Sequence, residues 1–323
     1  MKKIIILPYF GQFNEYFNLW LKSCEYNKNI DWLIITDCMY RDKLPQNIKL
    51  INMKFNELVD FIQRKFIFKI NLKNPYKLCD YRPCYGYIFN EYIKGYDFWG
   101  YCDCDLIFGD IEKFLNEDMF KTYDKILRRG HLSFIRNTED INTNFFKYDT
   151  YKMILKSPAS YAYDESVYGY HNGFAGELLE SGYKFLEDSE YIADIEFRKK
   201  PFTIINSDDR KYIFSFENGK TYKIYLFNEK IIKEEVMYIH FQKRKMKNLL
   251  QISLDKFLMC PNEFFKYDES LIPLKINQSE ALDEEKYFNY NKEKLEAIKR
   301  DIIRFLYEPK KISSLIYRVK SKL

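Results

Sequence analysis

Short apolar runs alternate with helix-like segments through the first third of the chain. Runs rich in apolar and β-branched residues cover positions 4–9, 32–37 and 48–53, while apolar residues recur at helical spacing over 13–26 and 57–65. This order predicts a βαβαβ opening, which forms a parallel sheet with right-handed crossovers and helices on both faces. We therefore expect the loops that leave the strand ends to gather around one crevice.

The pattern changes in the rest of the chain. Apolar positions from 85 to 93 follow helical spacing between Pro83 and Gly95, and strands are predicted at 97–101 and 132–136. Farther on, the pattern indicates a helix at 172–181 and strands at 202–206, 213–216, 222–227 and 236–241, with few parallel crossovers. Beyond Tyr267 the chain is polar, and 284–307 is typical of a charged helix. The sequence thus predicts an α/β chain with a mixed second half and a helical tail.

The composition is that of a folded protein without a membrane-spanning helix. Of the 323 residues, 46% are hydrophobic and 31% charged, with only 11 Gly and 9 Pro. No apolar run approaches the roughly 18 residues that a spanning helix needs. The net charge of +5 is modest and spread along the chain, so we expect no nucleic acid partner. Seven dispersed cysteines, an odd number, indicate reduced thiols in a cytoplasm.

Two aspartates follow the strand predicted at 97–101. Side chains alternate along an extended strand, so Asp103 and Asp105 should share one face while Cys102 and Cys104 face the core. Two carboxylates at a strand end suit Mg²⁺ or Mn²⁺ that also grips a diphosphate. The alternative is a pair of solvated loop acids or helix caps. The aromatic strand before the pair and the apolar triplet after it favour a metal-dependent enzyme acting on a nucleotide diphosphate.

The order of these features resembles the GT-A glycosyltransferases over residues 1–245. The shared features are the βαβ opening, a loop with Lys77, Asp80 and Arg82 that enters a helix, and the aspartate pair. Segment 101–110 is similar to the metal motif of members that assemble bacterial capsule, polysaccharide or lipooligosaccharide. The resemblance implies a GT-A-like fold, in which a Rossmann-like nucleotide-binding sheet is fused to a mixed acceptor-side sheet. Residues 1–125 would be the nucleotide-sugar-binding half, 126–265 the acceptor-side half of the same domain, and 266–323 a basic helical tail.

The resemblance also implies a reaction and a metal site. Such enzymes move a sugar, usually from a UDP-sugar, to a glycan hydroxyl with Mn²⁺ or Mg²⁺ bound. Asp105 would be the direct ligand, and Asp103 would lie nearer the ribose and metal-bound water. A late histidine often completes the shell, which points to His240. The alternative for His240 is an ordinary sheet histidine.

Further cofactor-binding candidates follow from position. A cationic loop suited to a departing diphosphate comes directly after the strand with His240 and consists of Lys243, Arg244 and Lys245. The candidates for the nucleobase pocket are Pro8, Tyr9, Phe10, Gly11 and Asp37. Lys77, Asp80 and Arg82 should reach base, ribose or phosphate. Each charged residue could instead be a helix cap or an exposed charge.

The acceptor side has weaker signals. Asp164 and Glu165, crowded by aromatic residues, are the candidates for a general base, and the alternative is an acidic helix start. A retaining enzyme would not need that base, so the stereochemistry stays open. His131, His171 and Asn172 are expected to border the donor sugar or acceptor, although either histidine could be structural.

The end of the chain is basic, with apolar residues interleaved among the cations. It contains Lys310, Lys311, Arg318, Lys320 and Lys322 and no acid. That pattern fits contact with an anionic membrane surface, where a lipid-linked glycan acceptor would lie. A terminal helix packed on the body is the alternative. We expect a cytoplasmic protein that is soluble or peripheral on the inner face of the membrane.

Two other functions remain open from sequence. A nucleotidyltransferase that makes sugar nucleotides would share the sheet and the metal. It should carry a Gly-rich first loop, whereas residues 7–11 contain one glycine and no lysine. A non-catalytic carbohydrate-binding protein is suggested by the aromatic and acidic residues alone.

Overall fold

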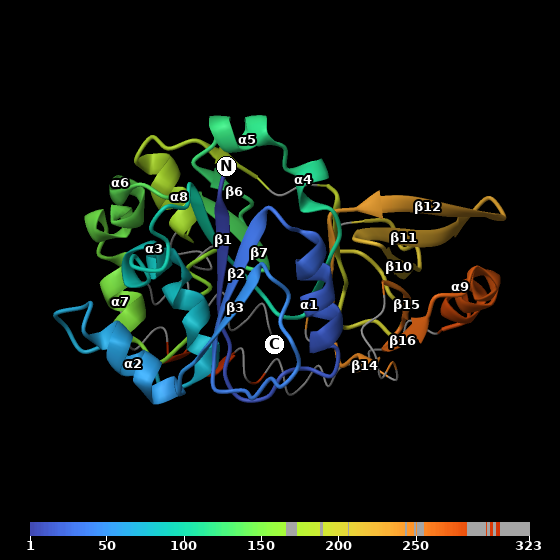
Figure 1. Cartoon of the computed structure of the whole chain (residues 1–323), viewed down its shortest axis with the longest axis horizontal. Coiled ribbons are helices and arrows are strands. Elements are labelled where there is room, and N and C mark those ends of the chain that lie inside the picture. Colours follow the sequence, from blue (N-terminus) through green and yellow to red (C-terminus); the bar gives the residue numbers. More distant parts are fainter. Residues whose placement is uncertain are drawn as a thin grey trace.

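A mixed sheet with four adjacent parallel strands forms the centre of the molecule in the computed structural model (Figure 1). The structure describes residues 1–165, 173–187, 190–205, 207–242, 244–248, 250, 255–282, 295, 298–299 and 302–303. The seven-stranded sheet has the order β3-β2-β1-β4-β7-β6-β8. Its first four strands run parallel and are β3 (Ile48–Asn52), β2 (Ile30–Thr36), β1 (Lys3–Pro8) and β4 (Phe98–Cys102). The predicted parallel opening is therefore confirmed.

The strands past β4 come from the middle of the chain. β7 (Leu132–Arg136) is antiparallel to β4, β6 (Lys125–Ile126) is antiparallel to β7, and β8 (Phe185–Leu186) is parallel to β6. The central sheet therefore contains strands from both of the predicted halves of the domain, 1–125 and 126–265.

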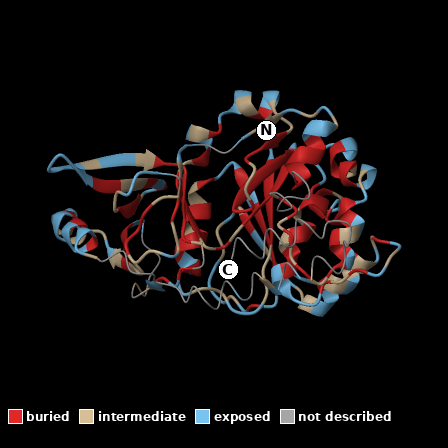
Figure 2. Cartoon of the chain, turned by 180° about the vertical axis from the view of Figure 1, so that it is seen from behind, coloured by how far each residue is buried: buried red, intermediate tan, exposed pale blue. Residues whose placement is uncertain are grey.

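Alternate residues of β1 enter two different cores. Ile4 and Ile6 pack on one face with α2 (Phe55–Gln63), whereas Ile5 and Leu7 pack on the other with α1 (Phe17–Tyr26). Because both faces of the sheet are covered, the inner strands β1 and β4 consist almost entirely of buried apolar residues. Figure 2 shows these central strands as buried.

Two further sheets lie beside the central one. The three-stranded sheet has the order β5-β13-β9, with β5 (Leu106–Phe108), β13 (Tyr238–His240) and β9 (Ile192–Asp194). The six-stranded sheet has the order β12-β11-β10-β15-β16-β14. Its strands are β10 (Ile213–Glu217), β11 (Lys220–Phe227), β12 (Lys230–Val236), β14 (Lys247–Asn248), β15 (Lys256–Cys260) and β16 (Glu263–Lys266). The predicted α/β class with a mixed second half is confirmed.

Short helices cover the remaining surface. They are η1 (Pro75–Cys84), α3 (Tyr85–Ile88), α4 (Ile111–Phe114), α5 (Glu117–Thr122), α6 (Glu139–Asn142), η2 (Asn144–Lys147), α7 (Thr150–Lys156), α8 (Gly173–Glu180), η3 (Glu269–Leu271) and α9 (Ile272–Glu280). α8 matches the predicted helix, and α9 packs on the six-stranded sheet through Ile272 and Ile276. Most of the predicted helix 284–307 and all of 310–323 lie outside the described residues. No helix in the described part is long and apolar enough to cross a bilayer.

Three predicted elements differ in the structure. The helix expected over 85–93 is only the four-residue α3, which directly follows the 3₁₀ helix η1 and ends at Ile88. The strand expected at 202–206 is wrong for its described part, 202–205, where only single bridges form and neighbouring carbonyls accept hydrogen bonds from Arg244. The strand expected at 236–241 divides at Met237, so that β12 and β13 belong to different sheets.

Candidate active site

Asp103 and Asp105 directly follow β4, at the carboxyl end of an inner strand of the central sheet. Cys102 and Cys104 are buried in the core beside α1, as the alternation predicted. The two aspartate side chains keep 33% and 29% of their surface exposed, so both can reach a ligand. The backbone N–H of Asp103 donates to the carbonyl of His131, and this bond ties the end of β4 to the start of β7.

The three-stranded sheet carries His240 to these carboxylates. β13 runs antiparallel to β5 and pairs His240 with Leu106, directly after Asp105. The Nε2 atom of His240 lies 3.4 Å from Oδ1 of Asp105 and 3.9 Å from Oδ2 of Asp103. The structure therefore brings the three predicted metal ligands together.

Asp194 fixes the orientation of the His240 ring. β9 pairs in parallel with β13 and places Asp194 opposite His240, where its Oδ1 lies 2.8 Å from Nδ1 of the ring. Gln242 and Arg129 also bind the Asp194 carboxylate, at 2.9 and 2.8 Å. With Nδ1 engaged, Nε2 faces Asp103 and Asp105. A carboxylate that holds the far nitrogen of a ligating histidine is the usual outer partner of a metal site.

Sequence reasoning missed Asp194 and Arg129. The only signal for Asp194 was an acid that ends a short apolar run, and the only signal for Arg129 was its place beside His131. Their meeting depends on the pairing of β9 with β13, which no local pattern specifies.

The ionisation of these groups reflects their crowding. Burial alone would lower the pKa of His240, but Asp105 and Asp194 outweigh it and raise the pKa to about 10. Burial raises the pKa of Asp105, against the opposing effect of His240. At Asp103 the balance is reversed: Arg82 and His240 outweigh burial and lower the pKa. The site therefore stabilises positive charge between the two carboxylates.

His131 lies against the His240 ring. Their ring centroids are 4.5 Å apart with 15° between the planes, and Nδ1 of His131 lies 2.7 Å from the Tyr238 hydroxyl. Burial, reinforced by His240, lowers the pKa of His131 to about 3, so this ring is neutral. Its buried Nε2 has no hydrogen-bond partner among the described residues. His171 and Asn172 lie outside the described residues.

Arg82 joins Asp103 to Asp164. Its Nη2 pairs with Oδ1 of Asp103, and its Nη1 lies 2.7 Å from Oδ2 of Asp164. Burial raises the pKa of Asp164 to about 7, against the opposing charge of Arg82. Glu165 accepts a hydrogen bond from the backbone of Gly130 at 2.8 Å. A Cβ at Gly130 would collide with the ends of the Arg82 and Asp164 side chains, so a larger residue there would displace this ion pair.

Lys77 and Asp80 are placed differently from the prediction. Both side chains are buried, and the Lys77 ammonium donates to Oδ2 of Asp80 and to the carbonyls of Ile154 and Ala159. Asp80 also accepts from the backbone N–H groups of residues 161 and 163. All three ammonium hydrogens of Lys77 therefore already have acceptors. We correct the expectation that Lys77 and Asp80 contact base, ribose or phosphate. This buried pair fixes the segment that leads into Asp164.

The loop after β1 meets the end of β2, as its position predicted. The backbone N–H of Gly11 donates to Oδ1 of Asp37 at 3.0 Å, and Gly11 has φ +108°. Tyr9 is half-buried, and burial together with Cys104, Cys38 and Asp105 raises its pKa. Phe10 packs edge-on against a ring of α2 at 5.3 Å. Pro8 ends β1, so the predicted pocket segment from Pro8 to Gly11 lies at the carboxyl end of this strand.

The predicted cationic loop has a different structure at Arg244. Its guanidinium is buried and donates to the Asn262 side chain and to the backbone carbonyls of Glu196, Lys199, Lys200 and Pro201. The expectation that Arg244 faces a diphosphate is therefore corrected to a role in holding this turn. Lys245 is exposed, and Lys243 lies outside the described residues.

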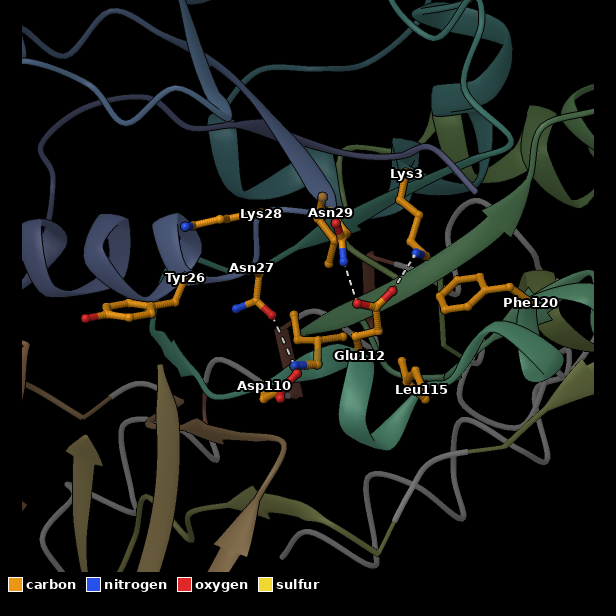
Figure 3. Close-up of a pocket in the computed structure, with 11 residues that line it drawn as sticks. Lys3, Tyr26, Asn27, Lys28, Asn29, Asp110, Glu112, Leu115 and Phe120 are labelled. Atoms are coloured by element: carbon orange, nitrogen blue, oxygen red, sulfur yellow. Dashed lines mark hydrogen bonds and ion pairs between the residues drawn. The ribbon is translucent and has the colours of Figure 1, made fainter. Parts of the chain in front are cut away.

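A cavity of about 280 Å³ lies elsewhere (Figure 3). Lys3, which begins β1, and Ile30, which begins β2, line it together with Glu112. Glu112 pairs with Lys3 at 3.9 Å and with the amide of Asn29. Parallel strands that begin at this cavity end at the opposite edge, where Asp103 and Asp105 lie. The cavity is therefore separate from the carboxylate site.

The carboxylates and His240 fit a divalent cation. One ligand atom from each of Asp103, Asp105 and His240 lies within 4.8 Å of the other two. Carboxylate oxygens suit Mg²⁺ and Mn²⁺, while an imidazole nitrogen suits the transition ion better, so the mixed set favours Mn²⁺. His131, Asp194 and His240 form a second such group, but the Asp194 carboxylate there already binds Gln242 and Arg129.

Comparison with protein families gives one match, over residues 5–268, to a family of unknown function, DUF6625. The chain belongs to this family. No curated protein matches the chain. Similar solved structures include the galactosyltransferase LgtC in complex with donor and acceptor sugar analogs, with TM-score 0.33, 11% identity, and coverage of 60% of this chain and 75% of LgtC.

Two other similar structures are also glycosyltransferases. GlyE of Streptococcus pneumoniae TIGR4 has TM-score 0.29, 11% identity, and coverage of 59% of this chain and 45% of GlyE. Mouse xyloside xylosyltransferase 1 in its apo form has TM-score 0.33, 9% identity, and coverage of 61% and 88%. These likenesses are too distant to bear on the activity of this family.

Proposed function

We propose that this chain is a metal-dependent glycosyltransferase with a GT-A-like fold. It would move a hexose from a nucleotide diphosphate sugar, a UDP-hexose, to a hydroxyl of a growing bacterial surface glycan. The observation that carries the proposal is the cluster of Asp103, Asp105 and His240, with Asp194 behind the histidine, at the carboxyl ends of the parallel strands β1 and β4. Open α/β sheets bind nucleotides at the carboxyl ends of their strands.

Asp103, Asp105 and His240 would hold Mn²⁺ or Mg²⁺ against the diphosphate of the donor. The cation, when bound, offsets negative charge on the departing nucleotide. Asp194 keeps Nε2 of His240 directed at the site, and Arg82 holds Asp103 from the other side. Two of the three ligands are therefore oriented by other charged side chains before any donor binds, which lowers the cost of assembling the site.

The nucleoside would occupy the loop after β1. Tyr9 and Phe10 offer aromatic surfaces there, and the Gly11 N–H fixes one oxygen of Asp37. The other oxygen of Asp37, which is exposed, could accept from a nucleobase N–H. Lys245 is exposed on the turn after His240 and remains a candidate for phosphate contact, together with Lys243.

Asp164 and Glu165 would serve the acceptor side. Burial raises the pKa of Asp164 to about 7, which suits a group that accepts a proton from a hydroxyl near neutral pH. His131, with its unpartnered buried Nε2, would border the donor sugar, and we retain His171 and Asn172 in the same role. The acceptor would be a glycan or lipid-linked glycan at the inner face of the membrane.

Nucleotide release tests the proposal. The chain is incubated with a panel of UDP-sugars and other sugar nucleotides with Mn²⁺, and release is compared between wild type, Asp105→Ala and the exposed-loop control Asp42→Asn. We expect donor hydrolysis or transfer that Asp105→Ala lowers by about 10²-fold or more, while the control stays at the wild-type rate. Full activity of Asp105→Ala without metal would contradict the proposal. Release of pyrophosphate from a nucleoside triphosphate would identify a nucleotidyltransferase instead.

A further inference from the structure

The loop between α2 and η1 is basic and exposes a large apolar side chain. Arg64, Lys69 and Lys73 are exposed, and Ile67 has a relative exposure of 107%. Residues 61–79 include no acid. In Figure 1 this loop projects beyond α2 at the left edge of the molecule. None of these three cations forms an ion pair with a residue that the structure describes.

Neighbouring residues hold this loop in place. Phe66, Ile70 and Leu72 are buried in the core on either side of Ile67. The Gln63 side chain donates to the carbonyls of residues 66 and 68 and accepts from the N–H of residue 70. The N–H of residue 71 donates to the carbonyl of Leu155 at 2.7 Å. The exposure of Ile67 is therefore set by a bonded loop, because the residues around it are anchored.

Helix α7 extends the positive charge. Lys156 is exposed, and its ammonium lies 5.2 Å from the ring centroid of Phe68. Lys65 adds a further cation, bound to the Asn90 side chain at 3.1 Å. We call this surface the basic loop face, and it consists of Arg64, Lys65, Ile67, Lys69, Lys73 and Lys156.

We propose that the basic loop face docks the protein on an anionic lipid bilayer, with Ile67 entering the interfacial layer. Clustered cations are attracted to anionic headgroups, and an apolar side chain at their centre gains by leaving water. A single isoleucine is a weak anchor, so the cations must supply much of the affinity and binding should fall with salt. This inference rests on neither the proposed transfer reaction nor the basic tail.

Vesicle partition of the full chain tests the role of the charges. The matched variants are Arg64→Gln/Lys69→Gln/Lys73→Gln and, with the same change in net charge, Lys28→Gln/Lys220→Gln/Lys230→Gln, whose lysines are exposed elsewhere. Each basic residue near an anionic surface changes partition roughly five-fold. We expect wild type to bind phosphatidylglycerol vesicles in preference to phosphatidylcholine, the loop variant to bind about 100-fold more weakly, and the control to lose far less.

The result that overturns the proposal is equal loss in both triple variants, or wild-type binding by the loop variant. Equal binding of wild type to neutral and anionic vesicles would also overturn it. If wild type binds a duplex oligonucleotide more tightly than anionic vesicles, and the loop variant loses that binding, the basic loop face would be a nucleic acid surface instead.

Tryptophan fluorescence tests insertion at Ile67 independently of total affinity. The three native tryptophans are at most 1% exposed, so a new surface tryptophan dominates any change on binding. Ile67→Trp should shift to the blue with phosphatidylglycerol vesicles. Leu226→Trp, on the β11–β12 hairpin at the opposite end of the molecule in Figure 1, should not. An unchanged spectrum of Ile67→Trp on vesicles that bind the protein would exclude insertion of this loop.

Discussion

The Oδ1 atom of Asp194 lies 2.8 Å from Nδ1 of His240, and the two residues face each other across the β9–β13 pair. Strand pairing and side-chain chemistry therefore specify the same contact. A shift of register by one residue would turn Asp194 away from the ring, because alternate side chains point to opposite faces.

Replacement of Asp194 should weaken metal binding. Asp194→Asn removes the negative charge behind His240. It also weakens the preference for the tautomer that carries its proton on Nδ1 and leaves Nε2 unprotonated. We therefore expect Mn²⁺ affinity to fall about 10- to 100-fold. Calorimetric titration of Mn²⁺ measures the change. Asp209→Asn, which alters an exposed ion pair with Lys199, is the matched control. Equal Mn²⁺ affinity in Asp194→Asn and wild type would rule out this positioning role.

Arg82→Lys should lower activity although the charge is kept. A lysine offers one ammonium where the guanidinium spans two carboxylates, Asp103 and Asp164, and so cannot hold both. We expect kcat/KM, measured with the sugar nucleotide that the donor panel selects, to fall on the order of 10²-fold. Arg128→Lys, at an exposed pair with Glu187, should behave as wild type. Near-normal kcat/KM in Arg82→Lys would show that the bridge is dispensable.

The buried Lys77–Asp80 pair should be important for stability. Lys77→Met leaves the Asp80 carboxylate buried without its cation, and breaking a buried pair in this way costs about 3–5 kcal/mol in the free energy of unfolding. Urea denaturation measures this loss. Lys94→Met, at an exposed pair with Glu91, should show no measurable change. Lys77→Met combined with Asp80→Asn should recover part of the stability, and failure to recover any would assign the loss to packing instead.

Glu177 should make the stability depend on pH. Burial raises the pKa of this carboxyl from 4.5 to about 7, although the Tyr163 hydroxyl donates to it. The folded state therefore favours the protonated form, and the cost of ionising it appears as pH rises from about 4.5 to about 7. Relative to wild type, Glu177→Gln should be more stable by about 3 kcal/mol above pH 7 and nearly equal at pH 4.5.

Unfolding measurements at pH 4.5, 6 and 8 test this sign. Glu229→Gln, an exposed substitution on the turn between β11 and β12, should follow wild type at every pH. A difference between Glu177→Gln and wild type that shrinks with rising pH would contradict the assignment.

Local patterns were sufficient where neighbours in sequence decide the structure. The strands β1 to β4 follow from apolar runs, and the outward position of Asp103 and Asp105 follows from alternation along a strand. The burial of Lys77 and Arg244 could not be predicted in this way. Charged residues enter a core only when distant groups receive them, and here those groups include backbone carbonyls from other segments of the chain. The place of Asp194 likewise depends on a pairing between strands far apart in the chain.

Because a single guanidinium joins Asp103 to Asp164, these two carboxylates are energetically coupled. Removal of either carboxylate changes the charge felt by the other through Arg82, so the effects of the two losses should not sum. A double-mutant cycle between these aspartates would then report a coupling free energy across the site, even though neither carboxylate pairs with the other directly.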